Sequence, residues 1–298
     1  AALAEATGAR LAWVPRRAGE RSALDAGAAP SLLPGGRPVT DAAARAQVEQ
    51  AWETTISAVP GRDTTGILAA AAAGELGGLV IGGVELDDLP DPVAARAAIE
   101  TAGFVVSLEL RASAITELAD VVFPVAAAPE KSGAYLNWEG RVRPFNTALQ
   151  HAGGLDDARV LDTLGVELDV DLYTQTPQST TEDLSRLGGY AIPRPGSASY
   201  PKPVAKKAAK AAKGALTLAS WRPLLGGSRA EDFEPHLVGT RRPETVRVSA
   251  ATASAAGLVD GALARVSGPA GSVTLPVTVT FIADDVAWLP AKVAGVSL

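Results

Sequence analysis

The stretch Glu130–Phe145, which reads EKSGAYLNWEGRVRPF, gathers acidic, basic, amide and aromatic side chains within a few positions. It follows the apolar run ADVVFPVAAAP, which is typical of a buried strand. Because ligands of open α/β sheets bind beyond the carboxyl ends of the strands, this stretch is the first candidate for a binding site. The polar residues and the glycine that could take part are Glu130, Lys131, Gly133, Asn137, Glu139, Arg141 and Arg143.

These residues have two interpretations. Beside a phosphate-bearing cofactor, the arginines would bind the phosphate, and Gly133 would free the backbone for a turn. Without a cofactor, Glu130 and Glu139 would hold Lys131 and the arginines in an internal cluster of ion pairs and hydrogen bonds that locks the loop.

Other catalytic patterns are weak. His151 and His236 lie far apart, and no G-x-S-x-G motif accompanies them, which disfavours a Ser-His-Asp hydrolase. The stretch ELGGLVIGGVELDD lacks the glycine patterns of dinucleotide and Walker sites, so its glycines indicate a tight strand exit. The chain has no cysteine and lacks the usual ligand spacings for iron, zinc or copper. We therefore predict no catalytic residue and no metal site in this chain.

An acidic run follows the apolar stretch GGLVIGG, and it too has two interpretations. It could bind a hard cation, or it could be a solvated loop that ends in the N-cap of the next helix. We favour the loop with a helix cap. The run consists of Glu85, Asp87, Asp88 and Asp91.

Composition excludes several classes of protein. With 298 residues, of which 47% are hydrophobic, the chain can form one large domain or two moderate domains. A net charge of −6 argues against nucleic acid as the main partner. Its apolar stretches are interrupted before the roughly 18 residues that a membrane span needs, so we expect no direct membrane span. Because the chain contains no methionine, we expect it to be the rear portion of a longer polypeptide.

Up to residue 191, short β-rich runs alternate with Ala-rich helical runs. This alternation is typical of an α/β domain with a mainly parallel sheet. The pattern predicts strands at 10–15, 77–83, 104–110 and 120–125. It predicts helices at 41–58, 64–76, 91–103, 113–119 and 156–168, the first of them capped by Thr40 or Asp41.

The composition changes at residues 192–214, where four prolines precede alternating Lys and Ala. We expect a solvated linker there, although clustered lysines could also bind nucleic acid or anionic lipid. Beyond it, β-branched runs with Gly, Asp and Pro between them predict a small closed or nearly closed β-domain at 215–298. Its strands are expected at 215–221, 245–250, 262–268, 272–282 and 286–290.

Several segments resemble, in order, the molybdopterin oxidoreductase superfamily, which includes formate dehydrogenases and nitrate reductases. They are ALDAGAAPSLLPGGRPVTDAAARAQVEQAW, LVIGGVELDDLPDP and the run from FVVSLEL through EKSGAYLNWEGRVRPF. The terminal segment beginning ETVRVSAATASAAGLVDGALARVSG resembles the final pterin-dinucleotide-binding barrel of that superfamily. The resemblance covers most of residues 8–170 and the chain's end. It implies an α/β parallel-sheet domain at 1–191, followed by a β-barrel domain at 215–298.

Within the superfamily, NWEGRVRPF with PRRAGERSALDAG upstream resembles the large peripheral-arm subunits of proton-pumping NADH:quinone oxidoreductases, respiratory complex I. The resemblance implies a structural part without its own redox centre. Iron-sulfur clusters, 4Fe-4S and 2Fe-2S, would belong to a preceding N-terminal portion. Implied partners are the flavin- and NADH-binding subunit and the quinone-side iron-sulfur subunits, at the cytoplasmic face of the bacterial plasma membrane.

Departures from the catalytic pattern favour a cofactor-free fold. Gly83, Val84, Glu85 and Leu86 stand where molybdenum enzymes carry G-E-N-P, and Leu108 with Glu109 stands where they carry Gln-Asp. By resemblance, both positions serve the guanine nucleotide of the pterin cofactor. We therefore expect no cofactor here, and we expect Glu130, Lys131, Gly133, Asn137, Glu139 and Arg141 to form a vestigial or structural cluster.

Trp138 and Phe145, with the neighbouring arginines, would then fill part of the space of the former pterin. The rival hypothesis is the back half of an active molybdopterin-dependent enzyme such as a formate dehydrogenase, with Glu130, Gly133, Asn137 and Arg141 near a bound pterin. A third, weaker hypothesis is a free-standing scaffold module.

Overall fold

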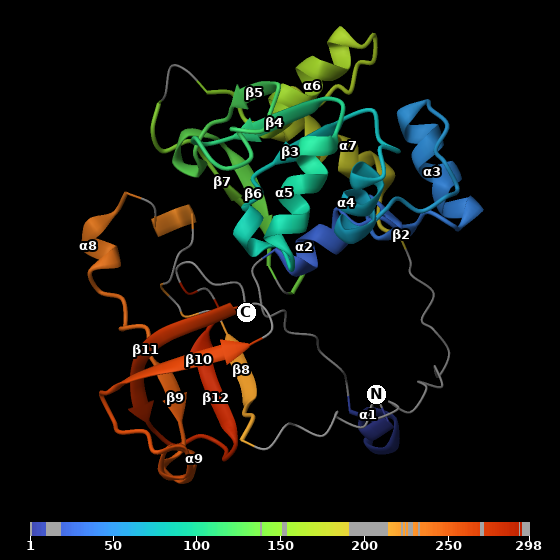
Figure 1. Ribbon diagram of the computed structural model, residues 1–298. Helices are drawn as coiled ribbons and strands as arrows, with labels where there is room; N and C mark the ends of the chain where they lie inside the picture. The colour runs from blue at the N-terminus through green and yellow to red at the C-terminus, as the bar shows by residue number, and fades with distance from the viewer. Residues whose placement is uncertain are drawn as a thin grey trace. The chain divides into compact units, whose positions relative to one another are not determined.

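The computed structural model of the chain describes residues 2–9, 19–137, 139–150, 154–190, 214–221, 223, 225, 229–231, 233–268, 271–291 and 293. The chain divides into two compact units, Ala1–Gly196 and Ser197–Leu298 (Figure 1). The strand predicted at 10–15 lies outside the described residues, as does nearly all of the linker predicted at 192–214. The predicted domain boundaries therefore stay a prediction.

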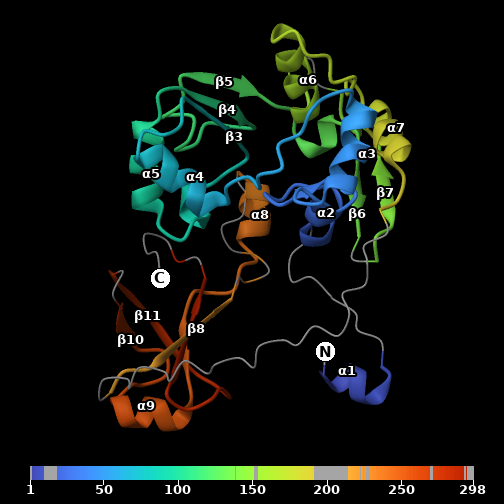
Figure 2. The same ribbon diagram turned by 90° about the vertical axis from the view of Figure 1, so that its right-hand side faces the viewer.

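A parallel sheet forms the centre of the first unit. Its strands are β3 (Leu79–Gly82), β4 (Val105–Glu109) and β5 (Val121–Pro124), in the order β3-β4-β5. One face packs on α4 (Thr64–Ala72) and α5 (Pro92–Thr101), as Figure 2 shows. The buried residues of this core are Leu86, Ala95, Ile99, Val105 and Ile115. The parallel strands and their covering helices confirm the predicted α/β fold.

Acidic caps start several of the helices. Asp41 accepts main-chain N–H groups of Ala43 and Ala44 at the start of α3 (Ala42–Trp52), which settles the choice between Thr40 and Asp41. Asp156 caps α6 (Asp157–Glu167) in the same way. Of the five predicted helices, those at 41–58, 64–76, 91–103 and 156–168 are confirmed in type, although the first and second end earlier than expected.

The helix predicted at 113–119 is wrong. The chain forms turns there. Ser113 donates its main-chain N–H to Thr116 Oγ1 at 2.8 Å, and that hydroxyl group donates to the Ser113 carbonyl at 2.8 Å. These local side-chain bonds compete with helical hydrogen bonding, which is why a Ser and Thr pair overrode the apolar spacing.

Several smaller elements complete the first unit, among them β2 (Arg37–Pro38) and α7 (Pro177–Leu187). A buried arginine, Arg37, joins these two elements. Its guanidinium group donates to the carbonyl groups of Pro34, at 2.9 Å, and Leu187, at 2.7 Å, and to Gln47 Oε1 at 2.9 Å. The elements are α1 (Ala2–Thr7), α2 (Glu20–Asp25), β1 (Leu32–Leu33), β2 (Arg37–Pro38), η1 (Leu86–Asp88), η2 (Ala128–Glu130), β6 (Gly133–Leu136), β7 (Val142–Phe145) and α7 (Pro177–Leu187).

The second unit contains a mixed sheet in the order β10-β11-β9-β12-β8. Its core is made of buried aliphatic residues that include Val246, Val248, Leu275, Val277 and Leu289. The strands are β8 (Thr217–Trp221), β9 (Val246–Val248), β10 (Leu263–Gly268), β11 (Gly271–Val279) and β12 (Val286–Pro290), with η3 (Arg229–Glu231), α8 (Pro235–Val238) and α9 (Ala250–Ala256) between them. All five predicted strands are confirmed.

Candidate functional site

The stretch from Glu130 to Phe145 lies beyond the carboxyl end of β5. After β5 the chain makes the single turn η2, in which Glu130 accepts the main-chain N–H of Ala127 at 3.1 Å. Val125 bridges to Leu155 in parallel fashion, which joins the end of β5 to the segment before α6. The remainder of the stretch forms a β-hairpin of β6 and β7. It is therefore a small element of regular structure, where the sequence had suggested a loop.

Asn137 organises the tip of this hairpin. Its side-chain Oδ1 accepts hydrogen bonds from the main-chain N–H groups of Glu139, at 3.0 Å, and Arg141, at 2.9 Å. The main-chain N–H of Asn137 donates to the Arg141 carbonyl at 3.0 Å. Gly140 lies between them with a φ of 82°, a left-handed conformation that suits glycine. Glu139 Oε2 and Arg141 Nε form an ion pair at 3.2 Å. The tip thus brings together three of the predicted residues.

The base of the hairpin uses a residue that the sequence did not single out. Lys131 Nζ lies 2.6 Å from Asp157 Oδ2, in the first turn of α6. This ion pair fastens the hairpin to α6. The predicted cluster is therefore divided into a group at the tip and a group at the base, which β6 and β7 separate. Spacing alone could not reveal Asp157, because it lies 26 positions after Lys131 in the sequence.

Gly133 has a different role from the one predicted. It lies within β6, directly opposite Phe145 of β7, and is not part of a turn. A Cβ atom added at Gly133 would lie 2.9 Å from Phe145 Cζ, so the glycine makes room for the aromatic ring. Phe145 in turn stacks on Tyr135, with the ring centres 5.0 Å apart. Trp138, the other aromatic residue of the hypothesis, lies outside the described residues.

The acidic run after β3 is divided among separate roles. Glu85 Oε1 pairs with Arg111 Nη2 at 2.9 Å, and Asp91 caps α5 by accepting the N–H of Ala94 at 2.9 Å. The interpretation as a loop with a helix cap is confirmed for Asp91. Asp87 and Asp88 lie in η1.

The end of β4 carries a buried carboxylate. Glu109 is 3% exposed, and its Oε1 accepts the N–H of Leu110 at 2.8 Å. Its neighbour Leu108 is equally buried and packs within reach of Gly82 on β3. At the carboxyl end of β4 the side chains therefore already contact other groups of the protein.

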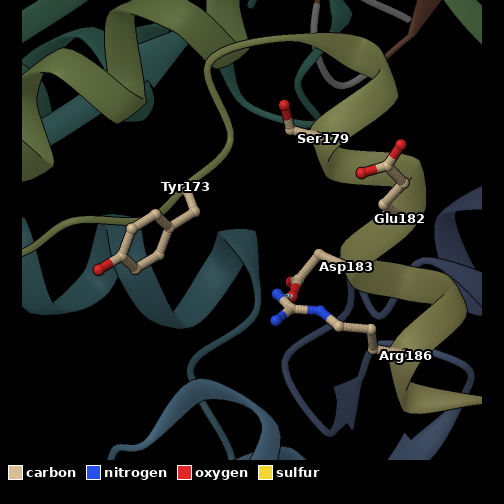
Figure 3. Close-up of a pocket in the computed structure, with 5 residues that line it drawn as sticks. All are labelled: Tyr173, Ser179, Glu182, Asp183 and Arg186. Atoms are coloured by element: carbon tan, nitrogen blue, oxygen red, sulfur yellow. Dashed lines mark hydrogen bonds and ion pairs between the residues drawn. The ribbon is translucent and has the colours of Figure 1, made fainter.

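A pocket of 390 Å³ beside α7 was not suggested by the sequence. Figure 3 shows side chains of α7 along it and Tyr173 from the preceding loop, with its hydroxyl group turned away from the helix. Asp183 accepts from Trp52 Nε1 at 2.9 Å and pairs with Arg186, while Glu182 accepts from Gln178 at 2.8 Å. The polar groups along the helix therefore bond mainly to one another. The i, i+3, i+4, i+7 spacing of Ser179, Glu182, Asp183 and Arg186 is the signal that could have predicted this polar face.

Two further observations concern membranes and metals. Among the helices that the structure describes, none is long and apolar enough to cross a membrane. Over the same part of the chain, no group of three His, Cys, Asp or Glu side chains is placed to hold a metal ion. His236 lies in α8 of the second unit, and His151 lies outside the described residues.

Comparison with known proteins gives a consistent result. The profile of the molybdopterin oxidoreductase family matches residues 4–155. The chain is 50% identical over 299 residues to the G subunit of NADH-quinone oxidoreductase from Mycobacterium tuberculosis, covering 99% of the chain and 37% of that protein. It is also 50% identical over 298 residues to the protein of the same name from Streptomyces coelicolor, covering 97% of the chain and 35% of that protein. The chain thus spans little more than a third of the length of these relatives.

A more distant similarity reaches an enzyme of a different kind. A putative formate dehydrogenase of Staphylococcus haemolyticus is 25% identical over 169 residues, which cover 56% of the chain and 17% of that protein. The similarity to the two NADH-quinone oxidoreductase proteins is therefore both higher in identity and longer.

Proposed function

We propose, from the premise that this chain belongs to the molybdopterin oxidoreductase family, that it is a structural and cofactor-free part of an NADH:quinone oxidoreductase subunit. The observation that carries the proposal is 50% identity over 99% of the chain to a protein that is named as such a subunit. The chain would support a longer polypeptide that passes electrons from NADH towards quinone, coupled to proton translocation. No residue of the chain is assigned a redox step.

The side chains at the positions that resemble the nucleotide site of molybdenum enzymes do not fit a pterin dinucleotide. Glu85 is paired with Arg111, and Leu108 offers only a buried hydrocarbon side chain. In the hairpin, Asn137 and Arg141 bond within the tip, and Lys131 bonds to Asp157. A cofactor would have to break these contacts before it could use the same groups. This supports the structural interpretation of the predicted cluster.

The remaining features of the proposal rest on the resemblance to the large peripheral-arm subunits of respiratory complex I. Iron-sulfur clusters, 4Fe-4S and 2Fe-2S, would be held outside this chain, which has no cysteine ligands. Its partners would be other peripheral-arm subunits, including the flavin- and NADH-binding subunit and the quinone-side iron-sulfur subunits. The assembly would lie at the cytoplasmic face of the bacterial plasma membrane.

The rival function is that of a formate dehydrogenase or a similar molybdopterin enzyme. It is supported by the distant similarity at 25% identity, and by membership of the same family. It is disfavoured because the polar groups of the hairpin and at the carboxyl end of β4 already bond to other groups of the protein.

Affinity purification tests the proposal. The full-length protein would be tagged in its own host, and solubilised membranes would be passed over the affinity resin. We expect NADH:quinone oxidoreductase activity and the flavin-containing subunit to elute with the tagged protein. Elution with formate-dependent dye reduction, and without NADH oxidation, would support the rival function and overturn this one.

A further inference from the structure

Apolar and acidic residues alternate where α6 ends and in the segment that follows it, which reads VELDVDLY. The five apolar side chains are between 44% and 75% exposed. They belong to Val166, Leu168, Val170, Leu172 and Tyr173, and the acidic residues among them are Glu167, Asp169 and Asp171. These eight residues are called the acidic end of α6 below.

Main-chain bonds fold this segment back on the helix. Val170 donates its N–H to the Gly165 carbonyl at 2.8 Å, and Asp169 donates to the Val166 carbonyl at 3.0 Å. In this Schellman pattern, an apolar side chain beyond the helix usually packs on a side chain of the last turn. Here the facing residue is Gly165, which has no side chain, and Val170 remains 52% exposed.

The far end of the segment is fastened to the same helix. Thr174 donates its N–H to Oδ1 of Asp162, a buried residue of α6, at 2.8 Å. Between the two ends, Leu172 packs so closely on Gly165 that an added Cβ there would lie 3.1 Å from Leu172 Cγ. The apolar side chains are therefore held on a bonded backbone at the surface. Contiguous exposed apolar patches of this kind mark interaction sites.

The carboxylates give this surface a definite charge. Among the described residues, no lysine or arginine pairs with any of the three, and Asp171 accepts the main-chain N–H of Tyr173 at 2.8 Å. The sequence from 166 to 186 contains five carboxylates and one arginine. That arginine, Arg186, pairs with Asp183. Cations supplied from outside would therefore complement the acidic end of α6.

This charge decides among the possible occupants of the surface. A second copy of the chain, docked on the same surface, would bring carboxylates against carboxylates. Nucleic acid and anionic lipid carry the same sign of charge. Like charges placed together across an interface cost several kcal/mol. The alternation of apolar and acidic residues instead fits a protein segment in which apolar side chains accompany lysine or arginine.

We propose that the acidic end of α6 is a docking site for a basic segment of a neighbouring subunit. Val166, Leu168 and Val170 contact the apolar side chains of that segment. The carboxylates between them pair with its lysine or arginine side chains. The inference rests on the proposed function, because it requires the chain to work within an assembly of several subunits.

Site-specific photo-crosslinking in the assembled complex tests this site. Benzoylphenylalanine would replace Val170 in the full-length protein, and the complex would be purified through a tag on a different subunit. We expect a covalent link from position 170 to another subunit, in a peptide that carries lysine or arginine beside apolar residues. As a control, the same probe would replace Val93, which is 80% exposed on α5. We expect roughly tenfold less product there, because no docking site is proposed at that position.

A variant without the charges tests the chemistry of the site. Glu167→Gln, Asp169→Asn and Asp171→Asn together keep the shape of the side chains and remove three negative charges. They should lower the cross-link at position 170 roughly tenfold, as expected for the loss of three exposed ion pairs. The matched control removes three exposed carboxylates elsewhere on the first unit and should leave the product unchanged. It combines Glu53→Gln, Asp87→Asn and Glu117→Gln.

A second variant tests the apolar contact. Leu168→Ser should also lower the product roughly tenfold, because it removes a large side chain from the centre of the surface. Val93→Ser, which shortens an equally exposed apolar side chain outside the surface, should not lower it. Melting curves of each variant separate a loss of docking from a loss of folding.

The outcomes distinguish this inference from the proposed function. If the complex contains the full-length protein but position 170 forms no link to another subunit, the docking site is wrong and the proposed function stands. A link only to another part of the same polypeptide, such as the Lys-rich residues 202–213, would refute the site in the same way. So would a link that the charge-free variant leaves unchanged in folded protein. If the full-length protein is absent from the complex, the proposed function fails and this inference fails with it.

Discussion

At the scale of single residues, Asn137 holds the hairpin tip, where the sequence had predicted a cluster of both ion pairs and hydrogen bonds. Its amide oxygen accepts two main-chain N–H groups, whereas the partners in the Glu139 and Arg141 ion pair are 42% and 67% exposed. Exposed ion pairs contribute little because water screens them and their side chains lose entropy. The sequence could suggest that the Asn137 amide forms hydrogen bonds, but its main-chain partners could be known only once the chain reversal at Gly140 was known.

We therefore expect Asn137→Ala to destabilise the chain more than Arg141→Ala. The first should lower the free energy of unfolding by about 1 to 2 kcal/mol, because two main-chain donors lose their acceptor. The second should lower it by less than about 1 kcal/mol. Urea unfolding of the purified chain measures both. Equal losses of stability, or a larger loss for Arg141→Ala, would show that the ion pair and not Asn137 holds the hairpin tip.

A pH dependence arises where Asp41 caps α3. The N–H of Ala44 and then the Tyr190 hydroxyl group donate to this carboxylate and lower its pKa, and the same bond to Asp41 raises the pKa of Tyr190. The lowered pKa makes Asp41 stabilising above its unfolded pKa, and this contribution is lost as pH falls through the folded pKa. The raised pKa makes Tyr190 stabilising below its unfolded value of about 10, and this is lost as pH rises through the folded pKa.

Phenolate absorbance gives the test. Subtracting the titration of Tyr190→Phe from that of the unchanged protein isolates Tyr190, whose midpoint should lie above the ordinary value for tyrosine. In an Asp41→Ala background that midpoint should move back down, because the accepting carboxylate is gone. A Tyr190 midpoint that Asp41→Ala does not move would show that the hydrogen bond is absent in solution.

At the scale of elements, the accuracy of the sequence prediction follows the strength of each local signal. The strands β3 and β5 are continuous apolar runs, and β4 is mostly apolar. The helices α3, α5 and α6 begin with Asp caps, so periodicity and caps agree. The hairpin of β6 and β7 was missed because glycine, proline and charged residues interrupt its alternation. α7 was missed because PQSTTEDLSRL is rich in Ser and Thr, which have low helix propensity. In the candidate site, the contacts that decide its role are made with residues distant in sequence, such as that of Lys131 with Asp157.

The packing of Phe145 against Gly133 makes the hairpin sensitive to one methyl group. Gly133→Ala would place Cβ 2.9 Å from Phe145 Cζ, so we expect a loss of about 1 to 3 kcal/mol of stability. Phe145→Leu in the same chain should recover part of that loss, which a double-mutant cycle would measure. Gly77→Ala is the matched control, because nothing lies within 4 Å of a Cβ there. Additive effects of the two changes would contradict direct packing.

The docking of α7 depends on Arg37. Arg37→Lys keeps the charge but cannot donate together to Pro34, Leu187 and Gln47. We expect a loss on the order of 3 kcal/mol, because buried acceptors then lack donors. Arg62→Lys, at an exposed ion pair with Glu75, should cost far less. Thermal unfolding of both variants checks the contrast, and a small effect for Arg37→Lys would show that α7 docks through other contacts.

At the scale of the whole molecule, the chain has the fold of its family, and under the proposed function its polar groups serve that fold. The ion pairs of Lys131 with Asp157 and of Glu85 with Arg111 each connect two segments of the first unit that are distant in sequence. In an enzyme, such groups would have to remain available to a ligand, and a buried polar cleft without a ligand would leave donors and acceptors unpaired. Internal pairing removes that cost.

This view predicts the metal and cofactor content of the intact protein. The full-length protein, purified natively with its complex, should contain iron and no stoichiometric molybdenum or tungsten by mass spectrometry of the metals. Acid extraction and oxidation should release no fluorescent pterin, because the groups that would bind the cofactor are bonded to one another. An authentic formate dehydrogenase carried through the same extraction is the control that pterin can be recovered. If the extract contained about one pterin dinucleotide per chain, the hairpin and the carboxyl end of β4 would be a true cofactor site. The rival function would then be correct.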